Sequence, residues 1–249
     1  MLNLIGLGLN NENSITLEGL ELCRKSDKIY LETYTSKWNG SLEDLAKVVG
    51  KEIIKLERSD LEENSDKILF EAKEKKISVL ILGDPLVATT HTSLLLEAKK
   101  NGIETHIIHN ASIYSTVSET GLHLYKFGAT VTIPFPEKIS NETPKSIYKT
   151  IDGNIERGLH TLCLLDLISE ENKFMSPKQG IEILLGSDNI SEERELVVFG
   201  RSGTEKPFII YGKIKELLTE DFGDPPFVLI LPESLHFTEQ EYLSYYRVD

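Results

Sequence analysis

Short apolar runs alternate with amphipathic stretches over the first 110 residues, and this alternation limits the possible folds more than any other feature. Residues 79–82 form a fully apolar run, which is typical of a strand buried in a parallel sheet. Residues 17–25, 60–76 and 92–100 place apolar side chains at helical spacing. Such alternation of strands and helices predicts a parallel sheet with helices on both faces. The remaining elements expected in this part are strands at 3–5, 28–34, 53–56 and 105–108, and a short helix at 41–49.

The order of predicted elements changes after about Asn110, where strand candidates sometimes follow one another with little helix between them. This pattern predicts a mixed sheet in the second part of the chain. We therefore expect an α/β protein of two domains, residues 1–110 with a parallel sheet and residues 111–249 with a mixed one. The expected strands are 130–135, 162–168, 196–199, 208–214 and 227–231, and the expected helices are 144–157 and 177–185.

The charge balance argues against a nucleic-acid partner. The 249 residues carry a formal charge of −13, from 40 acidic and 27 basic residues, and the basic ones are scattered. A nucleic-acid binder needs a basic surface that displaces counterions from phosphate. An acidic chain instead attracts cationic ligands or a basic protein surface.

We expect a cytoplasmic protein without a membrane partner. No stretch approaches the roughly 20 apolar residues that cross a bilayer, and residues 1–8 lack the basic region of a secretory signal. The two cysteines, Cys23 and Cys163, have no Cys-x-x-Cys spacing. We interpret them as buried thiols, since their spacing fits neither a disulfide framework nor a zinc site.

A glycine pair follows the first predicted strand. Gly6 and Gly8 allow a tight turn and a close approach of the backbone to a ligand. The dinucleotide-binding motif requires a third glycine where Asn11 stands, which disfavours a nicotinamide or flavin enzyme. Taken alone, this loop is equally well interpreted as an ordinary turn between strand and helix.

Two polar residues also follow predicted strands. Asp84 comes after the apolar run, at the kind of strand end where α/β sheets bind ligands, and can accept hydrogen bonds from ribose hydroxyls or an ammonium group. A turn or a helix cap is the simpler interpretation. Ser112 can open the next helix and leave backbone N–H groups free for a ligand, or it can be an ordinary cap.

The histidines give no metal site. His106 and His109 are three residues apart on a predicted strand and should project to opposite faces, and there is no His-x-x-x-His pair. A Ser-His-Asp or Cys-His set cannot be argued from spacing, because such sets are recognised only in space. The sequence therefore indicates neither a metal enzyme nor a hydrolase.

Several segments, taken in order, carry a resemblance to a known family. They are LIGLGLNNENSIT (4–16), YLETYTS (30–36), ILGDPLVATTH (81–91), IHNASIYSTVSETGLHLYKFGATVTIPF (108–135), HTLCLLDL (160–167), DFGDPPFVLILP (221–232) and LHFTEQEYL (235–243). The set runs nearly end to end. It resembles the tetrapyrrole-methylase superfamily of S-adenosylmethionine-dependent enzymes, and within it the branch that modifies translation elongation factor 2 during diphthamide synthesis.

This resemblance implies a homodimer with the active site in a cleft between the two domains. It implies methylation of the amino group of a 3-amino-3-carboxypropyl-histidine on the elongation factor, with S-adenosylhomocysteine as the second product. The chain lacks an insertion after LLDL that is associated with eukaryotic relatives, which favours the archaeal type.

The resemblance also assigns cofactor-binding residues. They are Leu9, Asp84, Val87, Ser112, Ile113, Leu165, Gly203 and His236. The segment Gly200-Arg201-Ser202-Gly203 departs from the expected Ala-Arg-Ala-Gly, which puts the register of Gly203 in doubt, and Asn11 stands where relatives often have Asp. Nothing singles out a catalytic general base.

Two other functions fit an α/β chain of this kind. One is a precorrin or uroporphyrinogen methyltransferase, whose carboxylate-rich substrate requires a basic cleft that a chain at −13 without clustered Arg fits poorly. The other is a regulatory module that binds adenosine-containing ligands without turnover, since a fold alone does not fix a function.

Overall fold

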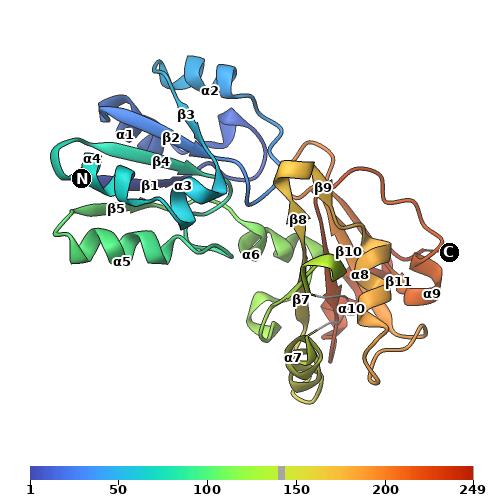
Figure 1. The fold of residues 1–249 in the computed structure, drawn as a ribbon. Helices are drawn as coiled ribbons and strands as arrows, with labels where there is room; N and C mark the ends of the chain where they lie inside the picture. The colour runs from blue at the N-terminus through green and yellow to red at the C-terminus, as the bar shows by residue number, and fades with distance from the viewer. Residues whose placement is uncertain (140–143, 249) are drawn as a thin grey trace. The chain divides into compact units, whose positions relative to one another are not determined.

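The computed structural model describes residues 1–139 and 144–248, which divide into two compact units. The first unit is Met1–Tyr114 and the second is Ser115–Asp249. Each unit has its own five-stranded sheet (Figure 1).

The N-terminal unit is built on a parallel sheet, as predicted. The strand order is β3-β2-β4-β1-β5, and all four pairings are parallel. β1 and β4 lie in the middle, and every residue of both strands is buried. The strands are β1 (Leu2–Gly6), β2 (Lys28–Glu32), β3 (Ile54–Leu56), β4 (Ile77–Ile81) and β5 (Thr105–Ile108).

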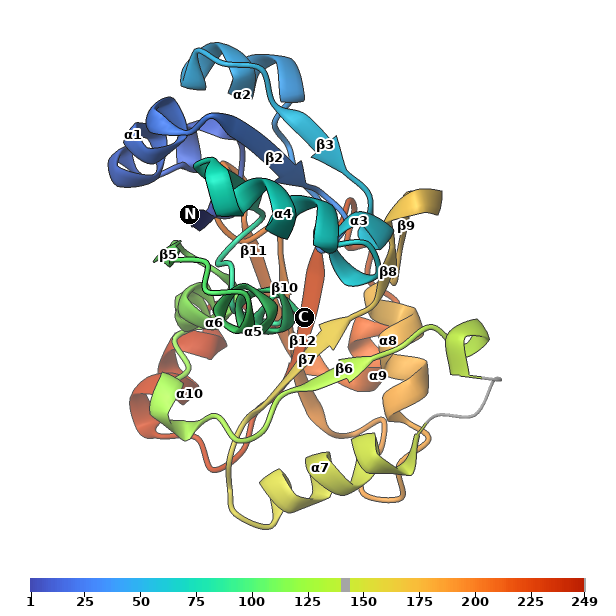
Figure 2. The ribbon, with the colours of Figure 1, turned by 60° about the vertical axis from the view of Figure 1, so that its left-hand side comes forward.

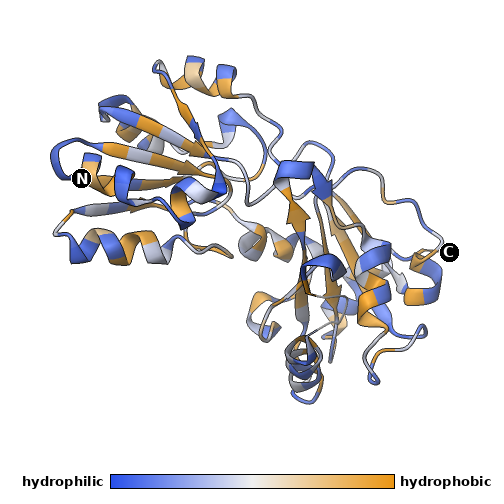
Figure 3. Cartoon of the chain, in the orientation of Figure 1, coloured by the Kyte–Doolittle hydropathy of each residue, from blue (hydrophilic) through white to orange (hydrophobic). Residues whose placement is uncertain are grey.

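Helices cover both faces of this sheet. α1 (Leu17–Lys25) and α2 (Leu42–Val49) pack apolar residues on one face. α4 (Asp66–Glu74) and α5 (Thr92–Lys100) pack on the other. Figure 3 shows the strands largely in the apolar colour and the helices with one apolar and one polar side. The expected α/β architecture of this part is confirmed.

The prediction of a single helix at 60–76 is wrong, because two separate helices form in this segment. α3 (Arg58–Glu62) ends where the backbone N–H and the side-chain amide of Asn64 donate to the Ser59 carbonyl, at 2.8 and 3.2 Å. This local bond competes with helix continuation. α4 then starts at Asp66.

The C-terminal unit has a mixed sheet, also as predicted. Its order is β11-β10-β12-β7-β6, with β6 parallel to β7 and the other pairs antiparallel. α7 (Lys145–Ile155), α8 (Pro177–Leu184) and α9 (Ile214–Leu217) contribute to one apolar core with this sheet (Figure 2). The strands are β6 (Val131–Ile133), β7 (Thr161–Leu165), β10 (Glu195–Gly200), β11 (Phe208–Lys213) and β12 (Phe227–Leu231).

Other elements are short. A two-stranded sheet pairs β8 (Leu167–Ile168) with β9 (Lys173–Phe174), so the strand predicted at 162–168 is interrupted at Asp166. No helix was predicted after β12, where α10 (Phe237–Ser244) lies. The rest are α6 (Ile113–Thr116) and the 3-10 turns η1 (Glu12–Ser14), η2 (Val117–Thr120), η3 (Leu124–Lys126), η4 (Pro136–Ile139) and η5 (Ser169–Glu171).

Both cysteines are free and buried, as expected. Burial raises the pKa of each thiol to about 12. Within residues 1–139 and 144–248, no helix has the length and apolar character needed to cross a membrane. The same residues contain no cluster of His, Cys, Asp and Glu that could hold a metal ion.

Candidate functional site

Three strands of the N-terminal sheet end side by side. Gly6 at the end of β1 pairs with Ile81 at the end of β4, and Ile5 pairs with Ile108 at the end of β5. Because the strands are parallel, their following loops leave the same edge of the sheet. This is the edge at which open α/β sheets bind ligands.

The first two loops are joined through their backbones. The N–H of Gly8 donates to the Gly83 carbonyl at 3.1 Å, and the N–H of Gly83 donates back to the Gly8 carbonyl at 2.8 Å. The backbone of both glycines is in the left-handed region, with φ of +73° and +69°. A Cβ on Gly6 would lie 2.6 Å from the Gly83 carbonyl oxygen, so the loops approach too closely for a side chain there. Glycine is therefore required by this contact, whatever the loop binds.

Asp84 joins the second loop to the third. Its Oδ1 accepts a hydrogen bond from the Leu86 N–H at 2.9 Å, the turn that the sequence allowed as the simpler interpretation. Its Oδ2 accepts from His109 Nδ1 at 2.8 Å and from the Asn110 N–H at 3.2 Å. The residue is only 5% exposed. Its carboxylate is therefore already engaged by protein donors from two loops.

Asn110 contacts the first loop as well. Its Nδ2 donates to the Gly6 and Ser14 carbonyls, both at 2.9 Å, and its Oδ1 accepts from the Ala111 N–H at 2.7 Å. Sequence reasoning missed this residue as a connector. The available signal was its place directly after β5, within the segment that contains Ser112.

Five of the predicted cofactor residues lie on these three loops. Leu9 follows Gly8 and is half-buried, and Val87 is half-buried in the loop that begins with Asp84. Ser112 is buried immediately before α6, and Ile113 is the first residue of that helix. The structure thus brings Leu9, Asp84, Val87, Ser112 and Ile113 to one edge of one sheet.

The other three predicted residues belong to the C-terminal unit. Leu165 ends β7, and Gly203 lies just after β10. Both strands run antiparallel to β12, so these two residues leave the same edge of the sheet. His236 follows β12, whose last residue pairs with Thr161 at the start of β7, and so it comes after the opposite edge. Within this unit the structure does not bring His236 to Leu165 and Gly203.

A buried carboxylate holds the backbone around His236. Glu239 is fully buried and accepts hydrogen bonds from the N–H groups of His236 and His123, at 2.7 and 2.8 Å. His160 Nε2 lies 3.1 Å away, and Lys126 also contacts the carboxylate. Burial opposes ionisation, but these donors outweigh it and lower the pKa of Glu239 to about 2. The carboxylate therefore stays charged and fixes the start of α10.

A second buried carboxylate closes the loop after β2. Glu32 is fully buried and accepts from the N–H groups of Tyr34 and Thr35, at 2.6 and 2.8 Å, and from the Thr35 hydroxyl at 2.9 Å. Burial raises the pKa of this carboxyl group, although the three donors oppose the shift. Glu32 thus fixes the backbone of the segment YLETYTS where it leaves β2, the strand beside β4.

His91 has a partner that the sequence did not reveal. Its Nδ1 lies 3.1 Å from the Pro85 carbonyl, which ties the start of α5 to the loop of Asp84. A carbonyl only accepts, so Nδ1 carries the proton. Burial lowers the pKa of His91, which favours the neutral ring.

Comparison with known proteins identifies the relatives of this chain. The model of the tetrapyrrole (corrin/porphyrin) methylases matches residues 1–218. A diphthine synthase of Methanocaldococcus jannaschii is 48% identical over 254 residues, which cover 98% of each chain. A diphthine synthase of Methanococcus vannielii is 44% identical over 252 residues, again 98% of each chain.

The fold has solved counterparts as well. A crystal structure of diphthine synthase superposes with a TM-score of 0.90 at 37% sequence identity. The superposition covers 99% of this chain and 95% of that one. The likeness therefore extends through both units and does not stop at the three loops.

Proposed function

The chain belongs to the tetrapyrrole (corrin/porphyrin) methylase family, and from this premise we propose that it acts as a diphthine synthase, a methyltransferase of diphthamide biosynthesis. The observation that carries the proposal is the full-length match to archaeal diphthine synthases at 44–48% identity. The joined loops after β1, β4 and β5 provide the site where the methyl donor would bind.

The donor in this proposal is S-adenosylmethionine. The acceptor is the amino group of a 3-amino-3-carboxypropyl-histidine on translation elongation factor 2. When bound, the sulfonium supplies an activated methyl carbon. In the transfer, the amine lone pair would form the new N–C bond as the C–S bond breaks, and S-adenosylhomocysteine would leave with the electron pair. The amine gives its proton to solvent or to a base on the protein.

The residues present fit a nucleoside ligand with a polar tail. A Cβ built on Gly83 would meet no atom closer than 3.8 Å, so there is room for close approach beside this backbone. Leu9 and Val87 offer half-buried apolar surface on the neighbouring loops. In this arrangement Asp84 would act mainly by fixing the loops, because protein donors already occupy its carboxylate.

The task of the protein is alignment of the two reactants. Holding a nucleophile and a methyl carbon about 3–3.5 Å apart contributes up to roughly 7–11 kcal/mol to the lowering of a barrier. The donor brings its own leaving group, so the chain needs no nucleophile of its own. We nominate no general base.

The test is methyl transfer to the elongation factor. Elongation factor 2 that carries the unmethylated intermediate is incubated with the protein and S-adenosylmethionine, and the modified peptide is analysed by mass spectrometry. We expect the mass of this peptide to increase by one or more methyl groups, located on the amino nitrogen. In a parallel incubation with uroporphyrinogen, methyl transfer to that acceptor would support the rival tetrapyrrole substrate. Binding of the donor without transfer to either acceptor would support a regulatory module.

The homodimer remains a prediction of the resemblance. Sedimentation equilibrium at micromolar concentration tests it, and a mass equal to one chain would contradict it.

A further inference from the structure

We infer that Asn110 is a positioning residue for the donor site, which holds the three loops in one arrangement through its side-chain amide and its backbone N–H. The inference rests on the proposed function for the identity of the ligand. The hydrogen bonds themselves do not depend on that identity.

The side-chain amide uses both of its protons on one loop. Nδ2 donates to the Gly6 carbonyl, where β1 ends, and to the Ser14 carbonyl, where η1 ends, each at 2.9 Å. Since carbonyls only accept, these two partners also fix which end of the amide is nitrogen. Asn110 therefore ties together the two ends of the segment that contains Leu9.

The remaining bonds connect the other two loops. The backbone N–H of Asn110 donates to Asp84 Oδ2 at 3.2 Å, and Oδ1 accepts from the Ala111 N–H at 2.7 Å. The second bond sets the chain direction just before Ser112 and α6. One residue thus has bonds to the loop of Leu9, the loop of Asp84 and its own loop.

The packing leaves little freedom at this position. A Cβ on Gly6 would lie 2.8 Å from the Asn110 Cβ, and a Cβ on Gly8 would lie 3.2 Å from its Oδ1. The asparagine side chain therefore fills the space against bare backbone. An Asp of the same shape keeps this packing but turns two donated hydrogen bonds into contacts between a carboxylate and two carbonyl oxygens.

The experiment compares Asn110→Asp with Asn101→Asp as a matched control. Asn101 lies in the same unit, and its Nδ2 donates to the Glu97 carbonyl at 3.0 Å at the exposed end of α5. Both variants make the same chemical change, but only Asn110 has bonds to the three loops.

Two measurements are made on the full chain. Calorimetric titration measures the affinity for S-adenosylhomocysteine, and hydrogen–deuterium exchange measures the protection of peptides that contain Gly8 and Gly83. For Asn110→Asp we expect affinity to fall about tenfold or more, since two donors are lost. We expect exchange to accelerate in those peptides while α2 and β2 keep the protection of the wild type. Asn101→Asp should match the wild type in both measurements.

The donor dependence of turnover provides a third reading. For Asn110→Asp we expect KM for S-adenosylmethionine to rise while kcat at saturating donor stays within about twofold, because the residue acts before chemistry.

Wild-type affinity with wild-type exchange in Asn110→Asp would overturn the inference. Accelerated exchange across the whole N-terminal unit would also overturn it, because the residue would then only stabilise the fold. If Asn110→Asp fails to fold, Asn110→Ala is judged by the same criteria. If the wild type methylates no elongation factor, the proposed function fails, whereas the exchange measurement still decides the role of Asn110.

Discussion

The carboxylate of Asp84 accepts hydrogen bonds from two loops, and this geometry determines the effect of removing the side chain. The residue is almost completely buried, and its three donors come from Leu86, His109 and Asn110. Loss of this acceptor leaves the N–H groups of Leu86 and Asn110 unpaired, at about 1–3 kcal/mol for each group that water cannot reach. The side chain of His109 is 68% exposed and can bond to water instead.

Asp84→Ala should therefore reduce both cofactor affinity and stability. We expect affinity for S-adenosylhomocysteine to fall at least about tenfold, and Tm to fall by about 2–4 °C for each kcal/mol lost. Asp27→Ala is the control, because Asp27 accepts one N–H bond, from Lys76 at 2.8 Å, and lies directly before β2, at the amino end of the strands. Unchanged affinity in Asp84→Ala would contradict the assignment.

Glu239 should make the free energy of unfolding depend on pH in the acidic range. The pKa of its carboxyl group is lowered from its usual 4.5 to about 2, so the stabilisation is complete above pH 4.5 and is lost as pH falls from there toward 2. The shift corresponds to about 3 kcal/mol. We expect the difference in free energy of unfolding between wild type and Glu239→Gln to shrink over this range. Glu241→Gln, exposed on the same helix, is the control, and a constant difference would contradict the prediction.

At the scale of elements, the sequence was most informative where apolar spacing and local turn chemistry agreed. α1, α5, β5 and β12 have the bounds that were predicted. The break between α3 and α4 was missed because helical spacing continues through it, and only the bonds of Asn64 reveal the stop. α10 was missed because Phe237 and Tyr242 are exposed, whereas Glu239 is buried, which reverses the usual pattern.

The candidate site was predicted less completely than the fold. Strand order could not be derived from residue spacing, so only the family resemblance indicated that the loops after β1, β4 and β5 would be neighbours. The residues that connect them, His109 and Asn110, make bonds to partners 25 to 104 positions away. Such contacts follow from topology, and no local spacing encodes them.

The glycine turn after β1 gives a prediction about conformation and space. Gly8 and Gly50 have similar φ, +73° and +79°, but a Cβ on Gly8 would lie 3.0 Å from the Ser14 Cβ, whereas Gly50 has nothing within 4 Å. Gly50→Ala should cost only the left-handed strain of about 1–2 kcal/mol in thermal unfolding. Gly8→Ala should cost more and should also weaken binding of S-adenosylhomocysteine. Equal effects in both assays would show that the crowding at Gly8 is unimportant.

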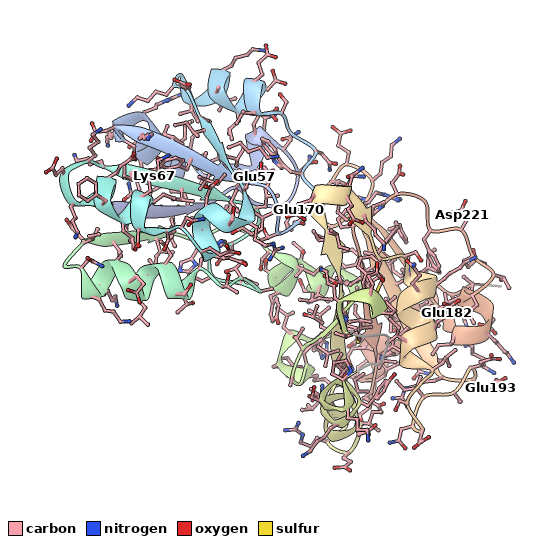
Figure 4. All side chains as sticks on the ribbon, in the orientation of Figure 1. Glu57, Lys67, Glu170, Glu182, Glu193 and Asp221 are labelled. Atoms are coloured by element: carbon pink, nitrogen blue, oxygen red, sulfur yellow. The ribbon has the colours of Figure 1, made fainter. Side chains whose placement is uncertain are left out.

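At the scale of the whole molecule, the excess of acidic residues is the main feature that bears on the proposed protein substrate. Figure 4 labels Glu57, Glu170, Glu182, Glu193 and Asp221, all of them exposed. They contribute to a formal charge of −13, whose attraction for a basic surface is screened by salt.

Salt should therefore affect the protein substrate more than the small one. We expect kcat/KM for the elongation factor to fall several-fold between low and high ionic strength, while the affinity for S-adenosylhomocysteine changes little. Steady-state kinetics and calorimetry in matched buffers measure the two quantities. Parallel changes in both would contradict an electrostatic contribution to docking.

Both cysteines of the chain are buried, and each belongs to a different unit, Cys23 on α1 and Cys163 on β7. A thiol with a pKa near 12 reacts slowly with alkylating reagents until its surroundings open. Pulsed alkylation in denaturant, read at each cysteine by peptide mapping, therefore measures the unfolding of the two units separately. The unaltered chain thus contains one internal reporter for each unit, and no engineered label is needed to learn whether they unfold together.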